Sequence, residues 1–122
     1  MSAPVLYLKD KCSFCLKVLI FLLETGQLDE VEVRSFVPGT PEEEALKAEL
    51  APHFENVTFP SAQIEPGVYM KDSDAIIARF AERAGIDFAD LPVFQWYSNG
   101  PFSQIGALYR ENMELKRQLA ES

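Results

Sequence analysis

The segment KDKCSFCLKVLIFLLETG, residues 9–26, holds the only cysteines of the chain and a long apolar run. Cys12 and Cys15 stand three positions apart at the start of that run. The run is too long for a strand, and Gly26 follows it where helices commonly end, so we expect a buried helix over residues 13–25. Cys12 should then lie at the first turn of this helix and Cys15 one turn further in. The pair could be a redox couple, half of a metal site, or two inert neighbours.

Two strands and a second helix are expected near this segment. PVLYL (4–8) is a short apolar run typical of a buried strand, and VEVRSF (31–36) alternates as a second strand does. Thr40, Pro41 and Glu43 fit the N-cap, N1 and N3 positions of a helix with a capping box. The apolar stripe of that helix consists of Leu46, Leu50 and Phe54.

A hairpin and a third helix complete the pattern. Residues 61–64 and 68–70 are expected to be short strands, joined by Pro66-Gly67 in a tight turn. DSDAIIARFAERAG (72–85) places apolar residues on one helical face and ends in glycine. The order β-α-β-α-β-β-α over residues 4–85 predicts an α/β domain with one parallel strand pair and an antiparallel hairpin. Ligands of such sheets bind at the carboxyl ends of strands, which is where the cysteines fall.

The composition limits the class of protein. With 122 residues and 48% hydrophobic content, the chain can form one domain with a real core. Its net charge of −8 argues against a nucleic-acid partner, which needs a basic face. No apolar stretch approaches the roughly 20 residues that cross a bilayer, and MSAPVLYLKDK does not have the pattern of a signal peptide, so we expect no membrane partner. The expected location is the reducing cytoplasm, where a CxxC pair indicates redox or metal chemistry.

The position of the cysteines favours redox chemistry. A helix N-terminus offers unpaired N–H groups and the positive end of the helix dipole, and both stabilise a thiolate. Lys9 and Lys11 act in the same direction, so Cys12 is the expected nucleophile and Cys15 the resolving thiol. A structural zinc site would need four ligands, and the chain has a single histidine, His53.

Three short motifs resemble known families. LYLKDKCSFC resembles the opening of glutaredoxins, in which a lysine precedes the first cysteine by three positions, as Lys9 does here. TFP (58–60) resembles the Thr-x-Pro of the thioredoxin fold, whose proline is cis and faces the active site. MKDSDAIIARFAER resembles the start of the last helix in glutathione transferase amino-terminal domains. Together the motifs cover residues 4–85 and imply a thioredoxin-like βαβαββα sandwich.

The resemblance also implies a glutathione site. Ser73 would bind the γ-glutamyl carboxylate of glutathione, Asp72 its ammonium group and Lys9 its glycine carboxylate, although Asp72 and Ser73 also suit ordinary helix capping. A cis Phe59–Pro60 bond would turn the Phe59 backbone toward the ligand. The full set implied as glutathione-binding is Lys9, Phe14, Phe59, Pro60, Asp72 and Ser73.

Departures from both families matter for the function. Ser13 and Phe14 stand where glutaredoxins often carry Pro and Tyr, and the Gly-Gly pair before their last helix is absent. Most transferases use a serine or tyrosine and have a long helical second domain. Here only residues 86–122 follow, so most of the pocket for a hydrophobic electrophile should be missing, and Tyr7 is expected to be a core residue.

These observations favour a glutathione-dependent thiol–disulfide oxidoreductase of glutaredoxin type, acting on disulfide or glutathionylated substrates. Three alternatives stay open: a transferase-like enzyme acting on glutathione conjugates, a glutaredoxin holding a [2Fe–2S] cluster between two protomers through its first cysteine and glutathione, and a non-catalytic glutathione-binding module.

The domain is expected to span residues 1–86. The residues that follow it, 87–122, are expected to form a linker with a helical extension. Residues 87–101 are Pro-bounded and aromatic, as in a connector, and residues 102–121 have a helical pattern. Apolar residues and one asparagine recur there at 3-4-3-4 spacing, so the helix could form a homodimer seam. Equally, it could pack on its own domain through Phe94, Trp96, Phe102 and Leu108. The residues of the seam pattern are Ile105, Leu108, Asn112, Leu115 and Leu119.

Overall fold

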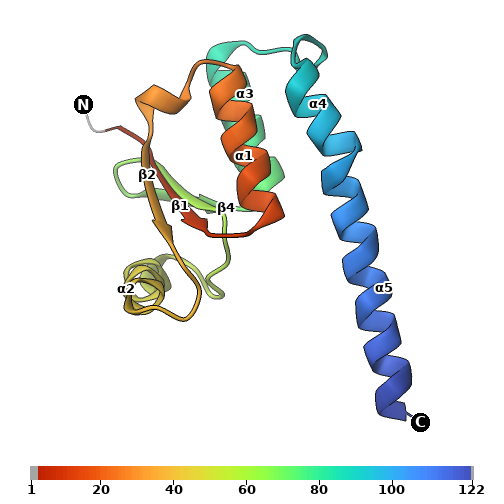
Figure 1. Ribbon diagram of the computed structural model, residues 1–122. Coiled ribbons are helices and arrows are strands. Elements are labelled where there is room, and N and C mark those ends of the chain that lie inside the picture. The colour runs from red at the N-terminus through yellow and green to blue at the C-terminus, as the bar shows by residue number, and fades with distance from the viewer. Residues whose placement is uncertain (1–2, 122) are drawn as a thin grey trace.

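A mixed four-stranded sheet organises the computed structural model, which describes residues 3–121 (Figure 1). The strand order is β2-β1-β3-β4, with β1 and β2 parallel and the other neighbouring pairs antiparallel. The predicted parallel pair and antiparallel hairpin are therefore confirmed. The strands are β1 (Val5–Lys9), β2 (Glu32–Phe36), β3 (Ser61–Glu65) and β4 (Val68–Lys71).

Helices cover both faces of this sheet. The larger core lies between the sheet and the helices α1 (Ser13–Glu24) and α3 (Ser73–Ala84). A smaller core on the opposite face joins the sheet to α2 (Pro41–Leu50) and includes Tyr7, as expected. Three short 3-10 helices lie between these elements, at Leu28–Glu30, Ala51–His53 and Phe88–Asp90. The thioredoxin-like sandwich is thus confirmed. Its fully buried side chains include Leu6, Val18, Phe21, Leu22, Leu50 and Ile76.

The start of α2 differs from the expected capping box. The helix begins at Pro41, but the Thr40 hydroxyl donates to the Val37 carbonyl at 2.6 Å instead of capping the helix. The Glu43 carboxylate accepts from the Gly39 N–H at 2.9 Å and also pairs with Lys47. Thr40 and Glu43, the two side chains that would form the capping box, therefore bond to the turn before the helix instead.

Residues 92–99 form a helix, α4 (Pro92–Asn99), so the expectation of a connector there was wrong. No local side chain caps this helix. Instead the Glu24 carboxylate of α1 accepts from the N–H groups of Val93 at 2.9 Å and Phe94 at 2.7 Å. Phe94 is buried, and its ring meets that of Phe21 edge-on at 5.6 Å. Glu24 and Phe21 lie about seventy residues before α4 in the sequence. The sequence around residues 92–99 therefore does not reveal the cap or the packing partner of this helix.

A single residue separates α4 from the last helix, α5 (Pro101–Glu121). A Cβ atom on Gly100 would lie 2.8 Å from the Trp96 carbonyl oxygen, so the chain turns here at a residue without a side chain. None of the helices described, α5 included, is both long and apolar enough to cross a membrane.

The last helix contacts the domain only near its beginning. Phe102 meets Phe14 of α1 edge-on at 5.1 Å, and residues 107–121 are all exposed. Figure 1 shows α5 running away from the sheet and the other helices. The expected packing on the domain thus holds for Phe94 and Phe102, while Trp96 is 73% and Leu108 60% exposed.

Candidate active site

Strand register brings the candidate site residues to one edge of the sheet. β1 ends at Lys9, and the cysteine loop follows directly. Ser61, the first residue of β3, pairs with Tyr7 on one side and Lys71 on the other. Phe59–Pro60, just before β3, and Asp72–Ser73, just after β4, therefore lie at the edge where β1 ends.

The two cysteines occupy different environments. Cys12 is the N-cap of α1, with φ −108° and ψ 121°, and its Sγ accepts from the Cys15 N–H at 3.4 Å. Cys15 lies one turn inside the helix and is only 2% exposed, whereas Cys12 is half-buried. The Cys15 Sγ accepts from the Lys9 N–H at 3.4 Å, so the end of β1 is joined to α1 through sulfur. Both thiols are free.

Hydrogen bonding separates the acidities of the two thiols. The hydrogen bond from the Cys15 thiol, helped by the backbone N–H groups of Cys15 and Phe14 and by the charge of Lys9, lowers the pKa of Cys12 to about 6. The same bond, together with burial, raises the pKa of Cys15 far above its ordinary value. The Cys15 thiol is the largest cause of the lowered Cys12 pKa. Its effect exceeds those of the helix N–H groups and of Lys9, which were the causes considered from the sequence. At neutral pH Cys12 is therefore mostly thiolate, and Cys15 keeps its proton.

We expect the alkylation rate of Cys12 to follow a titration with a midpoint near pH 6. The thiolate is the reacting form, so the rate should be close to its plateau at neutral pH. The folded pKa lies below the ordinary unfolded value of about 8.5, so the stability gained from this thiolate is complete above the unfolded pKa and is lost as the pH falls through 6.

Iodoacetamide labelling of the reduced protein across this pH range measures the midpoint, with Cys12→Ser as the control that removes the fast phase. Cys15→Ala deletes the donated hydrogen bond and should raise the midpoint. An unchanged midpoint near 8.5 in the wild-type protein would contradict the assignment.

The segments implied to bind glutathione have their own contacts. The Phe59–Pro60 peptide bond is cis, as the resemblance implies, and the Phe59 ring packs edge-on against Phe36 at 4.7 Å. Asp72 caps α3, its Oδ1 accepting from the Asp74 N–H at 3.2 Å, so the capping role does occur. Ser73 is 3% exposed at the start of α3. Lys9 is exposed, and Phe14 is half-exposed beside Phe102.

A pocket of about 510 Å³ opens beside the cysteines. The helices after the domain supply part of its wall, with Tyr97 from α4 and Ile105 from α5. The Tyr97 hydroxyl donates to the Ser13 carbonyl at 2.9 Å, and burial and the nearby Cys12 raise the pKa of this phenol. The helices beyond residue 86 thus add an apolar wall beside Cys12, and the expectation about a pocket for a hydrophobic electrophile stays a prediction. The apolar lining of the pocket beside the cysteines comprises Leu8, Leu16, Leu19, Val33, Tyr97 and Ile105.

Known proteins match both the sequence and the fold. Residues 6–88 match the family model described as the glutathione S-transferase N-terminal domain. The chain belongs to this family. No curated protein sequence matches it.

Two solved structures are similar to this glutathione S-transferase family chain. One is a glutathione S-transferase from the Antarctic clam Laternula elliptica, with 20% identity and a TM-score of 0.51 over 75% of this chain and 37% of that chain. The other is glutathione transferase Omega 3C from Trametes versicolor, with 21% identity and a TM-score of 0.48 over 77% and 37%. The clam protein shares the fold, and the present chain spans little more than a third of its length.

One buried cation in this glutathione S-transferase family chain was not anticipated from sequence. Lys17 is 8% exposed, and its Nζ lies 2.7 Å from Oδ1 of Asp74 and 4.6 Å from the centre of the Phe102 ring. It therefore connects α1 with the first turn of α3 and with the beginning of α5. A lysine inside an otherwise apolar helix was a visible signal, because a buried charge requires a partner.

Metal ligands are not grouped in this family member: residues 3–121 hold no set of three or more His, Cys, Asp or Glu side chains that could bind a metal ion. The iron–sulfur alternative thus receives no support from the side chains described.

Tyr97 and Lys17 are the site residues that sequence reasoning missed. Tyr97 could have been found from the sequence, because it follows Phe94 at the spacing of one helical face.

Proposed function

We propose that this chain is a glutathione-dependent thiol–disulfide oxidoreductase in which Cys12 is the nucleophile and Cys15 the resolving thiol. One observation carries the proposal. Cys12 is half-buried at a helix N-terminus with a pKa of about 6, beside a buried thiol that stays protonated. A thiol with a pKa near the ambient pH combines a large thiolate fraction with good nucleophilicity.

The reaction with a glutathionylated substrate needs only Cys12 and glutathione. The Cys12 thiolate attacks the glutathionyl sulfur of the mixed disulfide, a Cys12–glutathione disulfide forms, and the substrate leaves as its thiolate and takes a proton from water. A second glutathione thiolate then attacks the glutathionyl sulfur. This releases oxidised glutathione and restores the Cys12 thiolate.

A protein disulfide would also require Cys15. After Cys12 has formed a mixed disulfide with the protein, the Cys15 thiol loses its proton and attacks the Cys12 sulfur. A Cys12–Cys15 disulfide results, and the second substrate thiol is released. Two glutathione molecules then reduce that disulfide in turn and leave as oxidised glutathione.

Steady-state reduction of a small mixed disulfide by glutathione tests the proposal directly. Parallel assays would use glutathione with glutathione reductase, or thioredoxin reductase alone, as the electron source. Turnover is expected with glutathione. Turnover with thioredoxin reductase alone would instead place the chain in the thioredoxin class. A Cys12 that alkylates with an ordinary pKa, together with retained glutathione affinity, would favour the non-catalytic binding module.

We infer that glutathione binds at the sheet edge formed by Lys9, Phe59–Pro60, Asp72 and Ser73, with Phe14 at its border. The Ser73 hydroxyl and N–H at the start of α3 suit a carboxylate, and the exposed Asp72 carboxylate suits an ammonium group. Lys9 is available for the second carboxylate of glutathione.

Ser73→Ala and Asp72→Ala should therefore raise the KM for glutathione more than they lower stability. Loss of a charge-assisted hydrogen bond costs about 1.5–3 kcal/mol, or roughly 10- to 150-fold in binding, whereas loss of a helix cap costs about 1 kcal/mol. Both KM and thermal stability would be measured on the same samples. Asp87→Ala is a matched control, because the Asp87 carboxylate accepts from the Ala89 N–H as that of Asp72 does from the Asp74 N–H, but Asp87 follows the opposite end of α3. A large loss of stability with unchanged KM would leave Asp72 and Ser73 only the capping role.

The pocket favours a second candidate, the removal of glutathione from conjugates of apolar ketones. In that reaction the Cys12 thiolate attacks the sulfur of the conjugate, and the sulfur–carbon bond breaks. Its electron pair leaves with the carbon as an enolate, which takes a proton from water. A second glutathione resolves the Cys12–glutathione disulfide. Appreciable turnover of an aryl glutathionyl ketone, with little turnover of a mixed disulfide, would favour this activity.

A further inference from the structure

Helix α4 is bonded to α1 at both ends of α1. The first N–H groups of α4 donate to the Glu24 carboxylate at the end of α1. One turn further along α4, the Tyr97 hydroxyl donates at 2.9 Å to the carbonyl of Ser13, the first residue of α1. The two helices run in opposite directions (Figure 1), so this second contact lies next to Cys12, the N-cap of α1.

We propose that Tyr97 is a positioning residue for the nucleophile, whose hydroxyl acts through the Ser13–Phe14 peptide group on the N–H that supports the Cys12 sulfur. The side chain of an N-cap residue accepts from the N–H at N2 or N3, and Phe14 is at N2 of α1. The Ser13 carbonyl and the Phe14 N–H belong to one resonance-coupled peptide unit. A hydrogen bond to the carbonyl oxygen polarises that unit and makes its N–H a stronger donor. This role rests on the proposed function of Cys12.

The acidities of both groups agree with such a chain of hydrogen bonds. The Cys15 thiol is the largest cause of the low Cys12 pKa, and the backbone N–H groups of Cys15 and Phe14 lower it further. Tyr97 can act on this chain only while it keeps its proton. Burial and the nearby Cys12 raise the pKa of Tyr97, so the hydroxyl remains a donor while Cys12 titrates.

The surroundings of Tyr97 hold its hydroxyl in place. Tyr97 is 6% exposed, and hydrogen bonds shielded from water polarise one another more strongly than exposed ones. Phe94, one turn earlier, packs edge-on against Phe21 and fixes α4 on α1. The family model ends at residue 88, so this support for Cys12 comes from the part of the chain beyond the matched domain.

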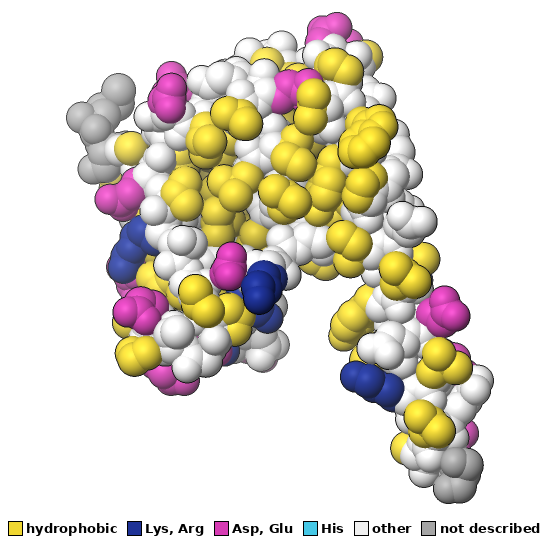
Figure 2. Space-filling model, in the orientation of Figure 1, with side chains coloured by type: hydrophobic (Ala, Val, Ile, Leu, Met, Phe, Trp, Pro, Cys, Tyr) yellow, Lys and Arg dark blue, Asp and Glu magenta, His cyan; other side chains and the backbone are white. Residues whose placement is uncertain are grey.

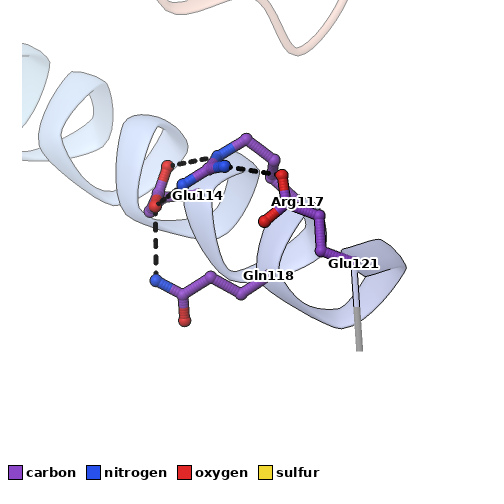
Figure 3. A network of polar contacts seen from close by, with 4 residues as sticks. All are labelled: Glu114, Arg117, Gln118 and Glu121. Atoms are coloured by element: carbon purple, nitrogen blue, oxygen red, sulfur yellow. Dashed lines mark hydrogen bonds and ion pairs between the residues drawn. The ribbon is translucent and has the colours of Figure 1, made fainter.

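The outer part of α5 is separate from this contact and provides a control. Residues 107–121 are exposed, and Figure 2 shows this helix standing apart from the rest of the molecule. Tyr109, on this part of α5, is 63% exposed and offers a second phenol for comparison. Side chains near the end of the helix bond to one another, as Figure 3 shows for Glu114, Arg117, Gln118 and Glu121.

The experiment compares Tyr97→Phe with Tyr109→Phe in the full 122-residue chain. Both variants lose a phenol hydroxyl and keep the ring, but only Tyr97→Phe loses the bond to Ser13. Tyr97→Phe should raise the midpoint of Cys12 alkylation by iodoacetamide by about 0.3–0.5 pH unit, because roughly 10–30% of the strength of one charge-assisted hydrogen bond is lost. Tyr109→Phe should keep the wild-type midpoint near pH 6.

The alkylation rate on the alkaline plateau distinguishes this effect from structural damage. A thiolate of higher pKa is the better nucleophile, so the plateau rate of Tyr97→Phe should equal that of the wild type or exceed it by up to about 1.5-fold. A distorted site would instead lower the plateau. The amide resonance of Phe14 is a second readout, which should shift in Tyr97→Phe and stay in place in Tyr109→Phe. Thermal melting checks that both variants are folded.

An unchanged midpoint in Tyr97→Phe would overturn the role of Tyr97, and so would a lowered plateau without a shift of the midpoint. A Phe14 amide resonance that is the same in both variants would also contradict it. These readouts need no turnover. Wild-type protein that fails to reduce a mixed disulfide would contradict the oxidoreductase assignment, while the alkylation midpoints would still decide the role of Tyr97.

Discussion

Cys12→Ser should lower the rate of reduction of every disulfide substrate by about a thousandfold or more, because no thiolate remains to attack. Serine has nearly the same size as cysteine and can keep the N-cap position of α1, so the folded state should survive. Rates would be measured with a small glutathionylated substrate and with a protein disulfide, with thermal melting as the check on folding. A Cys12→Ser protein that still turned over would contradict the whole redox assignment.

The effect of replacing Cys15 should depend on the substrate. Cys15→Ser should retain reduction of glutathionylated substrates, since a second glutathione resolves the intermediate, and should lose most reduction of protein disulfides. A serine hydroxyl can still donate a hydrogen bond toward the Cys12 sulfur, whereas alanine cannot. Cys15→Ala should therefore also raise the pKa of Cys12 and slow glutathionylated substrates at neutral pH. If Cys15→Ser were as inactive as Cys12→Ser on a glutathionylated substrate, the division into nucleophile and resolver would be wrong.

Phe94→Ala should destabilise the protein by about 3–5 kcal/mol, the usual cost of removing a buried phenylalanine. Its ring contacts those of Phe21 and Phe88, and its N–H is one of the two that donate to the Glu24 carboxylate. The matched control is Trp96→Ala, two residues away on the same helix but 73% exposed, for which a change within about 0.5 kcal/mol is expected.

Chemical denaturation of both variants, followed by circular dichroism, gives the two free energies of unfolding. Equal losses would mean that α4 is not held to α1 through Phe94. Activity measured on the folded fraction of Phe94→Ala adds a second readout. Tyr97 lies one turn further along α4 and lines the pocket, so displacement of the helix should impair apolar substrates more than small mixed disulfides.

Periodicity along the chain was sufficient to predict the thioredoxin-like domain. Each strand and helix over residues 4–85 carries its own apolar pattern, and glycines mark where α1 and α3 end. The order of elements then restricts the topology to a parallel pair and a hairpin. The positions of the two cysteines at the first turn of α1 followed from the same reasoning.

Features that depend on distant side chains were not predictable in this way. The cap of α4 comes from Glu24, and the partner of Lys17 is Asp74, so neither has a local signature. The pocket beside Cys12 needs Tyr97 and Ile105, whose positions are set only once α4 has docked on α1. The acidity of Cys12 was anticipated in direction, but its largest cause is a contact between two side chains and not the helix terminus.

The break at Gly100 has a mechanical consequence. Core packing positions α4, and the direction of α5 is set by the backbone at Gly100 together with the contacts of Phe102 with Phe14 and Lys17. At 1.5 Å per residue, the 21 residues of α5 form a lever about 30 Å long. A rotation of about 10° at its base would carry the far end roughly 5 Å sideways. The position of the far end of α5 is thus controlled at the base of this helix, next to the wall of the pocket.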